Sequence, residues 1–214
     1  MESADRQTIA DAAGWLDAGR RVWLATVAAT WGSSPRPAGS LLAVCEDGRL
    51  SGSVSGGCVE SELLGSLQRR RPARVETIRY GVTGEEARRL GLPCGGRLEL
   101  VVEPLDCAAP LRALLQAMDA RRPLRRRLCL ATGEVSLHAG DAARPFAYDG
   151  RNLDKLFGPQ WRLLIIGAGQ LSRYLAELAL GLDFEVIACD PRTQHEANWA
   201  VPGVELRTDM PDDL

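Results

Sequence analysis

Apolar and polar positions change their period several times along the chain, which predicts alternating strands and helices. An apolar run at 22–31 is typical of a buried strand, and apolar runs on both sides of Asp47-Gly48 predict a β-hairpin. Helical spacing of apolar residues predicts helices at 8–18, from 59 to about 68, at 83–90 and at 108–120. Further strands are predicted at 73–80 and 97–104, with two strands and irregular chain in 124–148. This alternation indicates an α/β fold.

The C-terminal part of the chain carries the clearest local pattern. A buried strand at 163–166 leads into Gly167-x-Gly169-x-x-Ser172, a helix follows, and a second strand at 184–189 ends at Asp190. This is the order of the first βαβ unit of a dinucleotide-binding fold, where glycines let a pyrophosphate approach the helix N-terminus. The acid after the second strand binds a ribose hydroxyl in such folds. The sequence therefore predicts an NAD(P) site at Gly167, Gly169, Ser172 and Asp190, although the same turn can serve packing alone. Arg192 could favour a 2′-phosphate, which leaves the type of nucleotide open.

The same patterns predict two domains. Residues 1–148 form an N-terminal mixed α/β domain, 149–161 a linker, and 162–214 a Rossmann-type βαβ domain with a short third strand at 204–206. A complete doubly wound domain needs two such halves. We therefore expect the second domain to be incomplete, because the chain is truncated or because a partner completes its sheet. Its helix places four apolar residues on one face: Leu171, Tyr174, Leu175 and Leu178.

Composition and charge exclude several classes of protein. Of 214 residues, 45% are hydrophobic and 25% charged, which is enough apolar material for a core. The 26 basic and 28 acidic residues nearly balance, which argues against nucleic-acid binding. The single lysine, Lys155, follows no glycine-rich loop, so there is no P-loop. The N-terminus lacks the pattern of a signal peptide, and Arg173 and Glu177 interrupt the most apolar later stretch. We expect a cytoplasmic protein without a membrane segment.

Two cysteines lie beside diglycines in mirrored order, as Ser55-Gly56-Gly57-Cys58 and Cys94-Gly95-Gly96. The first pair precedes a predicted helix, so Cys58 would occupy the first turn, where the helix dipole favours a thiolate. Glycine N–H groups beside a helix start also form an anion nest. The pattern predicts a site for an anionic, sulfur-binding ligand, and the alternative is that both are small buried thiols in tight turns. The other four cysteines are expected to be packing residues: Cys45, Cys107, Cys129 and Cys189.

Two charged residues adjoin the first cysteine element in the sequence. Arg36, in the loop GSSPRPAG, could bind a phosphate or carboxylate, or be a solvated loop arginine. Glu60 could contact a ligand, or compensate the dipole of the helix that follows Cys58. No CxxC or HExxH spacing occurs and there are only two histidines, so we predict neither a metal site nor a catalytic triad.

Four motifs together resemble the XdhC/CoxI family, whose members are accessory factors of xanthine dehydrogenase and related molybdenum hydroxylases. The resemblance covers most of 23–104 and 162–192, whereas 105–161 match loosely. The motifs are GSSPRPAGSLLAV, DGRLSGSVSGGCVESEL, GLPCGGRLELVVEPL and RLLIIGAGQLSRYLAELALGLDFEVIACDPR.

The resemblance implies a chaperone rather than a turnover enzyme. Family members bind the molybdenum cofactor, as molybdopterin or its dinucleotide form, support its sulfuration and insert it into the apo-enzyme. Expected partners are a xanthine dehydrogenase-type hydroxylase and a cysteine desulfurase, and the chain could form a homodimer. The cofactor would lie at Gly56, Gly57, Cys58, Cys94, Gly95 and Gly96.

Two positions depart from the family pattern, since Gln170 stands where a histidine is common and Ser172 replaces a third glycine. Two other functions compete with the chaperone. The Gly167–Ser172 turn would suit an NAD(P)-dependent oxidoreductase, and a non-catalytic scaffold would keep that turn only for packing.

Overall fold

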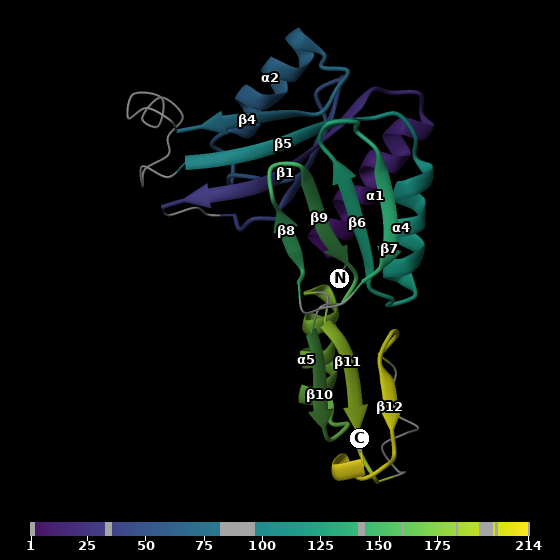
Figure 1. The fold of residues 1–214 in the computed structure, drawn as a ribbon. Coiled ribbons are helices and arrows are strands. Elements are labelled where there is room, and N and C mark those ends of the chain that lie inside the picture. The colour runs from purple at the N-terminus through teal and green to yellow at the C-terminus, as the bar shows by residue number, and fades with distance from the viewer. Residues whose placement is uncertain are drawn as a thin grey trace.

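The computed structural model divides the chain into two lobes, a larger N-terminal lobe and a smaller C-terminal lobe (Figure 1). It describes residues 3–32, 36–81, 97–140, 144–159, 161–182, 184–192, 199 and 201–213.

A five-stranded antiparallel sheet with the order β3-β2-β1-β5-β4 forms the centre of the N-terminal lobe. The strand at 22–31 and the hairpin around Asp47-Gly48 are confirmed. β1 and β2 are apolar on both sides because both faces of the sheet are covered. The strands are β1 (Val22–Trp31), β2 (Leu41–Cys45), β3 (Leu50–Gly52), β4 (Glu76–Tyr80) and β5 (Arg97–Leu105).

Helices cover this sheet from both sides. α1 (Ala4–Asp17) and α4 (Ala109–Asp119) pack on one face, around a core that contains Leu24 and Leu114. α2 (Glu60–Arg70) packs on the other face, where Leu63 and Leu67 join Trp23 in a second core. The helix predicted at 83–90 lies outside the described residues.

A second sheet, with the order β7-β6-β9-β8, packs beside the first. Its strands are β6 (Leu124–Cys129), β7 (Val135–Ala139), β8 (Phe146–Tyr148) and β9 (Asn152–Phe157). The interpretation of 149–161 as a linker needs correction, because β9 is a central strand that pairs with both β6 and β8. Two charged residues conceal it in the sequence. Asp154 and Lys155 are buried, and each is neutralised by a distant residue, Arg127 and Asp5 respectively.

A buried ion pair joins the two sheets. The guanidinium of Arg126 on β6 donates to both carboxylate oxygens of Glu103 on β5, at 2.8 and 2.6 Å, and both side chains are buried. Such a bidentate pair fixes the relative position of two elements, because displacement of either residue leaves a buried charge unpaired.

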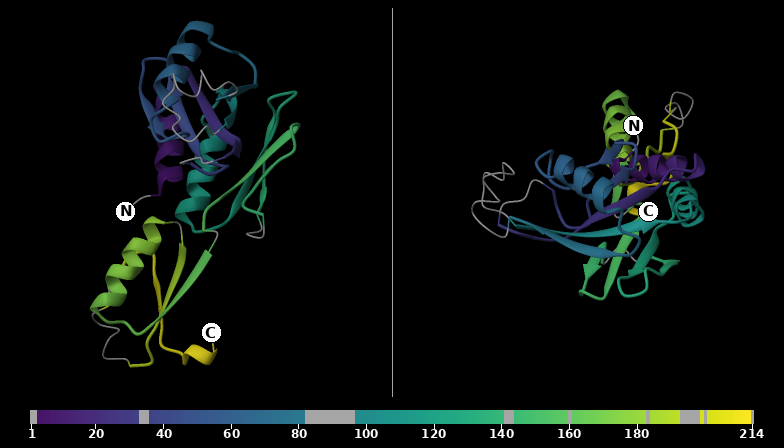
Figure 2. Two further views of the ribbon diagram at one scale, coloured as in Figure 1. Left: turned by 90° about the vertical axis from the view of Figure 1, so that its left-hand side faces the viewer. Right: turned by 90° about the horizontal axis from the view of Figure 1, so that it is seen from above.

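The C-terminal lobe is a βαβ unit with a third strand. β10 (Trp161–Ile166), β11 (Phe184–Cys189) and β12 (Glu205–Arg207) are parallel, in that order across the sheet. α5 (Gln170–Gly181) connects the first two strands and lies on one side of the sheet (Figure 2). The short helical turn η2 (Pro211–Asp213) follows β12. The βαβ pattern and the short third strand are thus confirmed.

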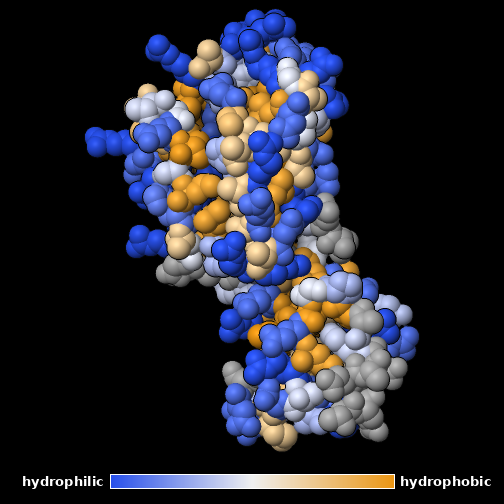
Figure 3. Space-filling model, turned by 90° about the vertical axis from the view of Figure 1, so that its right-hand side faces the viewer, coloured by the Kyte–Doolittle hydropathy of each residue, from blue (hydrophilic) through white to orange (hydrophobic). Residues whose placement is uncertain are grey.

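The apolar face predicted on α5 is not the one that packs on the sheet. Ala176 and Ala179 are buried against β10 and β11. The four predicted apolar residues are instead exposed and form a stripe beside that contact: Leu171, Tyr174, Leu175 and Leu178. They stay exposed because α5 has only a three-stranded sheet to pack against. Hydrophobic residues reach the surface of the lower lobe in Figure 3. Within the described residues, no helix is long and apolar enough to cross a membrane.

Candidate functional site

The loop Ser53–Val59 wraps around the carboxylate of Glu60, the first residue of α2. Backbone N–H groups of four residues donate to this carboxylate at 2.9–3.1 Å: Val54, Ser55, Gly57 and Val59. The hydroxyls of Ser53 and Ser55 donate to it as well. The carboxylate is therefore the centre of the loop, and the loop is built around a charge that the chain itself supplies.

The electrostatics of Glu60 follow from this ring of donors. Burial alone would raise the pKa of Glu60, but the hydrogen bonds from Ser55, Ser53 and the backbone outweigh burial and lower that pKa to about 2. The loop reaches this shape through Gly56 and Gly57, whose φ angles of 77° and 113° lie in the region that favours glycine. Glu60 is thus ionised at neutral pH and holds the diglycine turn in place.

This geometry corrects two predictions about the diglycine turn. The N–H groups of Ser55, Gly57 and Val59 donate to Glu60, so they do not form an open anion nest. α2 begins at Glu60 with Val59 as its N-cap, so Cys58 precedes the first helical turn instead of lying in it. Sequence spacing could not show either point, because both depend on which group the carboxylate reaches.

Arg36 contacts the same loop from the chain that follows β1. Its Nε donates to the backbone carbonyl of Ser53 at 3.2 Å, and the residue is half-buried. Ser53 also donates its hydroxyl to Glu60. The structure therefore brings Arg36, Gly56, Gly57, Cys58 and Glu60 together, with Arg36 supporting the loop. The binding of a cofactor by these residues stays a prediction.

Cys58 is a half-buried cysteine at the rim of this arrangement. It packs against the apolar core beneath α2, which contains Val59 and Leu63. At the neighbouring Gly57, no atom of the described residues, its two chain neighbours aside, lies within 4 Å of the place that a Cβ would occupy. The turn thus offers a soft sulfur donor beside open space, which suits the approach of a bulky ligand. Cys94, Gly95 and Gly96, predicted to share this site, lie outside the described residues.

The second glycine-rich loop, in the C-terminal lobe, also closes onto a carboxylate. Asp190, at the end of β11, accepts the N–H of Ala168 at 2.9 Å. It also accepts three hydrogen bonds from Arg192, from its backbone N–H, Nε and Nη2. The Arg192 guanidinium, followed by the Ala168 N–H, lowers the pKa of Asp190 well below its usual range. Asp190 thus binds both Arg192 and the loop.

The other predicted residues of this loop lie at the start of α5. Gly167 has a φ of 100°. At both Gly167 and Gly169, apart from the two chain neighbours, no atom in the part of the chain that the structure describes lies within 4 Å of the place that a Cβ would occupy. Gly169 is the N-cap of α5 and Ser172 lies in its first turn, half-buried. This backbone is open to a ligand, but the binding of a nucleotide there stays a prediction.

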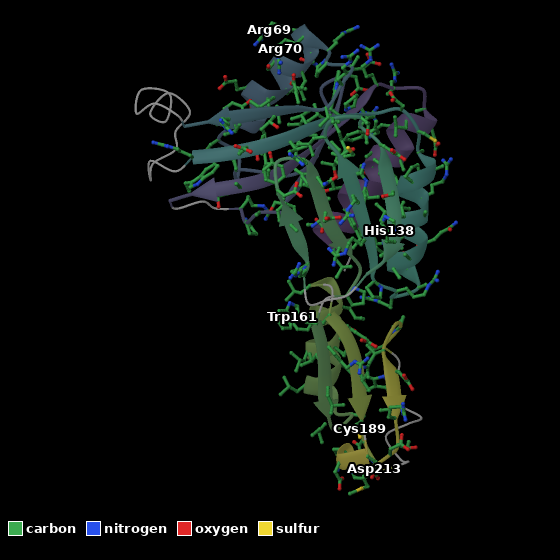
Figure 4. The ribbon with its side chains drawn as sticks, in the orientation of Figure 1. Arg69, Arg70, His138, Trp161, Cys189 and Asp213 are labelled. Carbon is green, nitrogen blue, oxygen red and sulfur yellow. The ribbon has the colours of Figure 1, made fainter. Side chains whose placement is uncertain are left out.

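The two glycine-rich loops lie far apart, in different lobes. Figure 4 places Cys189, the residue before Asp190, in the lower part of the C-terminal lobe, whereas α2 with Arg69 and Arg70 is at the top of the molecule. Those predicted cofactor-binding residues that the structure describes therefore lie in two separate places.

Comparison with known proteins identifies the segment that contains the first loop. Residues 15–81 match the model of the XdhC and CoxI family. This part of the chain is thus similar to that family.

Two known proteins are similar to larger parts of the chain. The chain is 38% identical over 116 residues to the molybdenum cofactor insertion chaperone PaoD of Escherichia coli, in an alignment that covers 51% of this chain and 34% of PaoD. The chain thus spans about a third of that relative. A crystal structure of a xanthine dehydrogenase from Bacillus halodurans has the same fold, with a TM-score of 0.66 at 21% identity, over 97% of this chain and 69% of the other.

One cysteine outside the XdhC and CoxI match, predicted to be a packing residue, has a distinct environment. Cys129 lies at the end of β6, half-buried, and hydrogen bonds from the side chain and backbone of Thr132 and the backbone of Ala131 lower the pKa of its thiol. Cys107 is exposed, and its sulfur accepts the N–H of Ala109 at 3.4 Å. Only Cys45 and Cys189 are buried as expected.

Proposed function

We propose that this chain binds the molybdenum cofactor and supports its sulfuration and insertion into a xanthine dehydrogenase-type molybdenum hydroxylase. The observation that carries the proposal is the loop Ser53–Val59, which lies inside the family match and presents Cys58 on a turn fixed by Glu60. A relative whose name is molybdenum cofactor insertion chaperone supports the same role.

The residues present fit this cargo. Molybdenum and its terminal sulfur are soft, and a thiolate is the side chain that suits them. Cys58 supplies the thiol, and the open space at Gly57 admits a bulky group to the turn. The N–H groups that could hold a phosphate are already bonded to Glu60, so the phosphate of the cofactor must be held by other groups, such as arginines.

In this role, the chain's own residues bind and orient the cargo. Cys58 contacts the soft end of the cofactor, Glu60 keeps the diglycine turn in one shape, and Arg36 holds that turn through the Ser53 carbonyl. A rigid turn lowers the entropic cost of binding, because less backbone freedom is lost when the ligand arrives. The partner proteins in this role would be a hydroxylase that receives the cofactor and a cysteine desulfurase that supplies sulfur.

The test is direct cofactor loading. The purified protein is incubated with molybdenum cofactor, separated from free ligand, and assayed for molybdenum and for pterin. We expect the parent to retain both, and Cys58→Ala to retain at least about tenfold less. Cys107→Ala is the matched control, because Cys107 is an exposed thiol remote from the loop. A parent protein that retains no cofactor would contradict the proposed function, and full retention by Cys58→Ala would contradict the role of Cys58.

A further inference from the structure

A cavity of about 340 Å³ lies at one end of the five-stranded sheet, lined by Trp31, Arg79, Tyr80, Arg97 and Leu98. Trp31 and Tyr80 end β1 and β4, whereas Arg97 begins β5, so three strand ends meet here. In Figure 1 this is the end of the sheet toward which β1 and β4 point. The cavity volume lies in the range of small-molecule sites.

Strand pairing puts an aromatic ring and two guanidinium groups on the same side of this sheet. Trp31 pairs with Arg97 across β1 and β5, and Arg79 pairs with Glu99 across β4 and β5. Paired residues of antiparallel strands share a face. Arg97 and Glu99 are two positions apart on β5, so all four residues project from one face.

The side chain of Arg79 is held in place by a neighbouring carboxylate. Its Nε donates to Glu99 at 2.6 Å, and Glu99, which is buried, also accepts the hydroxyl of Tyr148 at 2.9 Å. Among the described residues, the two Nη groups of Arg79 make no hydrogen bond, and Arg97 makes no hydrogen bond or ion pair with its side chain. The described part of the lining therefore holds two guanidinium groups with unused N–H donors, and none of its residues carries a carboxylate.

Trp31 supplies the apolar wall. Its side chain is 49% exposed although it is the largest apolar side chain on β1 at this end. An indole face that is open to solvent beside two guanidinium groups is suited to a planar ring that carries negative charge. The ring stacks on the indole, and the acid group accepts paired N–H donors from arginine.

We propose that this cavity binds a planar heteroaromatic anion, and that it holds the phosphate-bearing heterocyclic part of the cofactor cargo. The inference rests on the proposed function and deepens it, because the loop around Glu60 has no N–H group of Ser55, Gly57 or Val59 left for a phosphate. Two parts of a dinucleotide cofactor share the required chemistry, namely the pterin and the nucleotide. The cavity is chemically suited to either, so the test uses one probe for each.

The probes are pterin-6-carboxylate and cytidine monophosphate, titrated separately into the purified full chain by calorimetry, with inorganic phosphate as a third arm. We expect at least one heteroaromatic probe to bind and inorganic phosphate alone to bind more weakly, since it lacks a ring to stack. Trp31→Ala and Arg97→Ala should each weaken the bound probe at least about fivefold. Trp31→Phe, which keeps an aromatic face, should lose less than Trp31→Ala. The probe that binds identifies the source of the heterocycle.

Matched controls come from the other lobe. Trp161→Ala and Arg162→Ala remove an exposed indole and an exposed guanidinium, and neither should change the affinity. Absence of binding of both probes to the parent, or unchanged affinity in Trp31→Ala and Arg97→Ala, would overturn the cavity assignment. These results are distinguishable from failure of the proposed function, because cofactor loading that depends on Cys58 would persist.

Discussion

The two glycine-rich loops of this chain differ in how many of their N–H groups donate to a carboxylate of the chain itself. In the N-terminal lobe, four N–H groups and two hydroxyls converge on the buried carboxylate of Glu60. In the C-terminal lobe, Asp190 accepts one N–H of its loop, from Ala168, and is otherwise paired with Arg192. The carboxylate of Glu60 thus binds most of the first loop, whereas the carboxylate of Asp190 binds the second loop at one N–H group.

The difference shows that glycine content does not by itself make an anion site. A carboxylate inside the chain can occupy the N–H groups that glycines expose, as Glu60 does, and the loop then serves to orient a neighbouring side chain. Among the described residues, none approaches Gly167 or Gly169 at the place of a Cβ, chain neighbours aside, and none caps the start of α5 with its side chain. Charge and hydrogen bonding therefore assign a positioning role to the first loop and leave the backbone of the second accessible.

The largest effect should come from Glu60→Gln. The amide keeps the shape of the carboxylate but removes its charge, and it turns an NH₂ group toward N–H donors, which cannot accept its hydrogens. We expect the free energy of unfolding to fall by about 2–4 kcal/mol. Urea denaturation measures this loss, with Glu177→Gln as the control because Glu177 lies on the exposed face of α5. A loss equal to that of the control would show that Glu60 does not hold the loop.

The pH dependence of stability tests the same role of Glu60. The pKa of Glu60 is about 2 in the folded protein, against an ordinary value of 4.5. A carboxylate whose folded pKa is lowered adds stability that is present above its unfolded pKa and is lost as pH falls toward the folded one. The stability difference between the parent and Glu60→Gln should therefore narrow between about pH 4.5 and about pH 2. A difference that stays constant across this window would mean that Glu60 does not titrate as its hydrogen bonds require.

A smaller effect is expected from Asp190→Asn in the second loop. The substitution removes the charge that pairs with Arg192 and weakens the bond from the Ala168 N–H. Because only one N–H of this loop depends on the carboxylate, stability should fall less than in Glu60→Gln. Amide hydrogen exchange at Ala168 should become faster while exchange at Gly57 is unchanged. If Asp190→Asn were the more destabilising change, the contrast between the loops would be wrong.

The smallest effect concerns the two half-buried thiols. Thr132→Val removes the side-chain hydrogen bond that, with backbone N–H groups, lowers the pKa of Cys129. Below the thiol pKa, alkylation follows the thiolate fraction, so iodoacetamide should modify Cys129 a few-fold more slowly in this variant. The rate at Cys58, in the other half-buried position, serves as the internal reference. Equal rates at Cys129 in parent and variant would remove Thr132 as a cause of the lowered pKa.

Local patterns predict most of the strands and helices but miss where charged residues lie in the core. The apolar run of β1 and the Asp47-Gly48 turn are sufficient for their elements, since each signal is local. β9 resembles a linker in the sequence because Asp154 and Lys155 interrupt its apolar residues, and their partners Arg127 and Asp5 are remote in sequence. The spacing of apolar residues on α5 predicts which of them share a face, but it does not reveal which part of the helix meets the sheet.

The candidate site shows the same division. Its members Arg36, Gly56, Gly57, Cys58 and Glu60 can be named from the sequence, and the structure brings them together. The direction of the contacts is not predictable, because a carboxylate beside N–H donors can face a ligand or face the chain. The cavity at Trp31 and Arg97 cannot be predicted from the sequence, because its residues come from three strands and share no motif.

The sequence by itself determined the α/β class, the βαβ order of the C-terminal lobe, and the similarity of residues 15–81 to the XdhC and CoxI family. These features follow from hydrophobic periodicity and short motifs, which depend only on residues close together in the sequence. Only the tertiary structure decided that Glu60 occupies the N–H groups of its own loop and that Arg126 and Glu103 join the two sheets. Both depend on burial, because a charge removed from water must find its partner wherever the fold provides one.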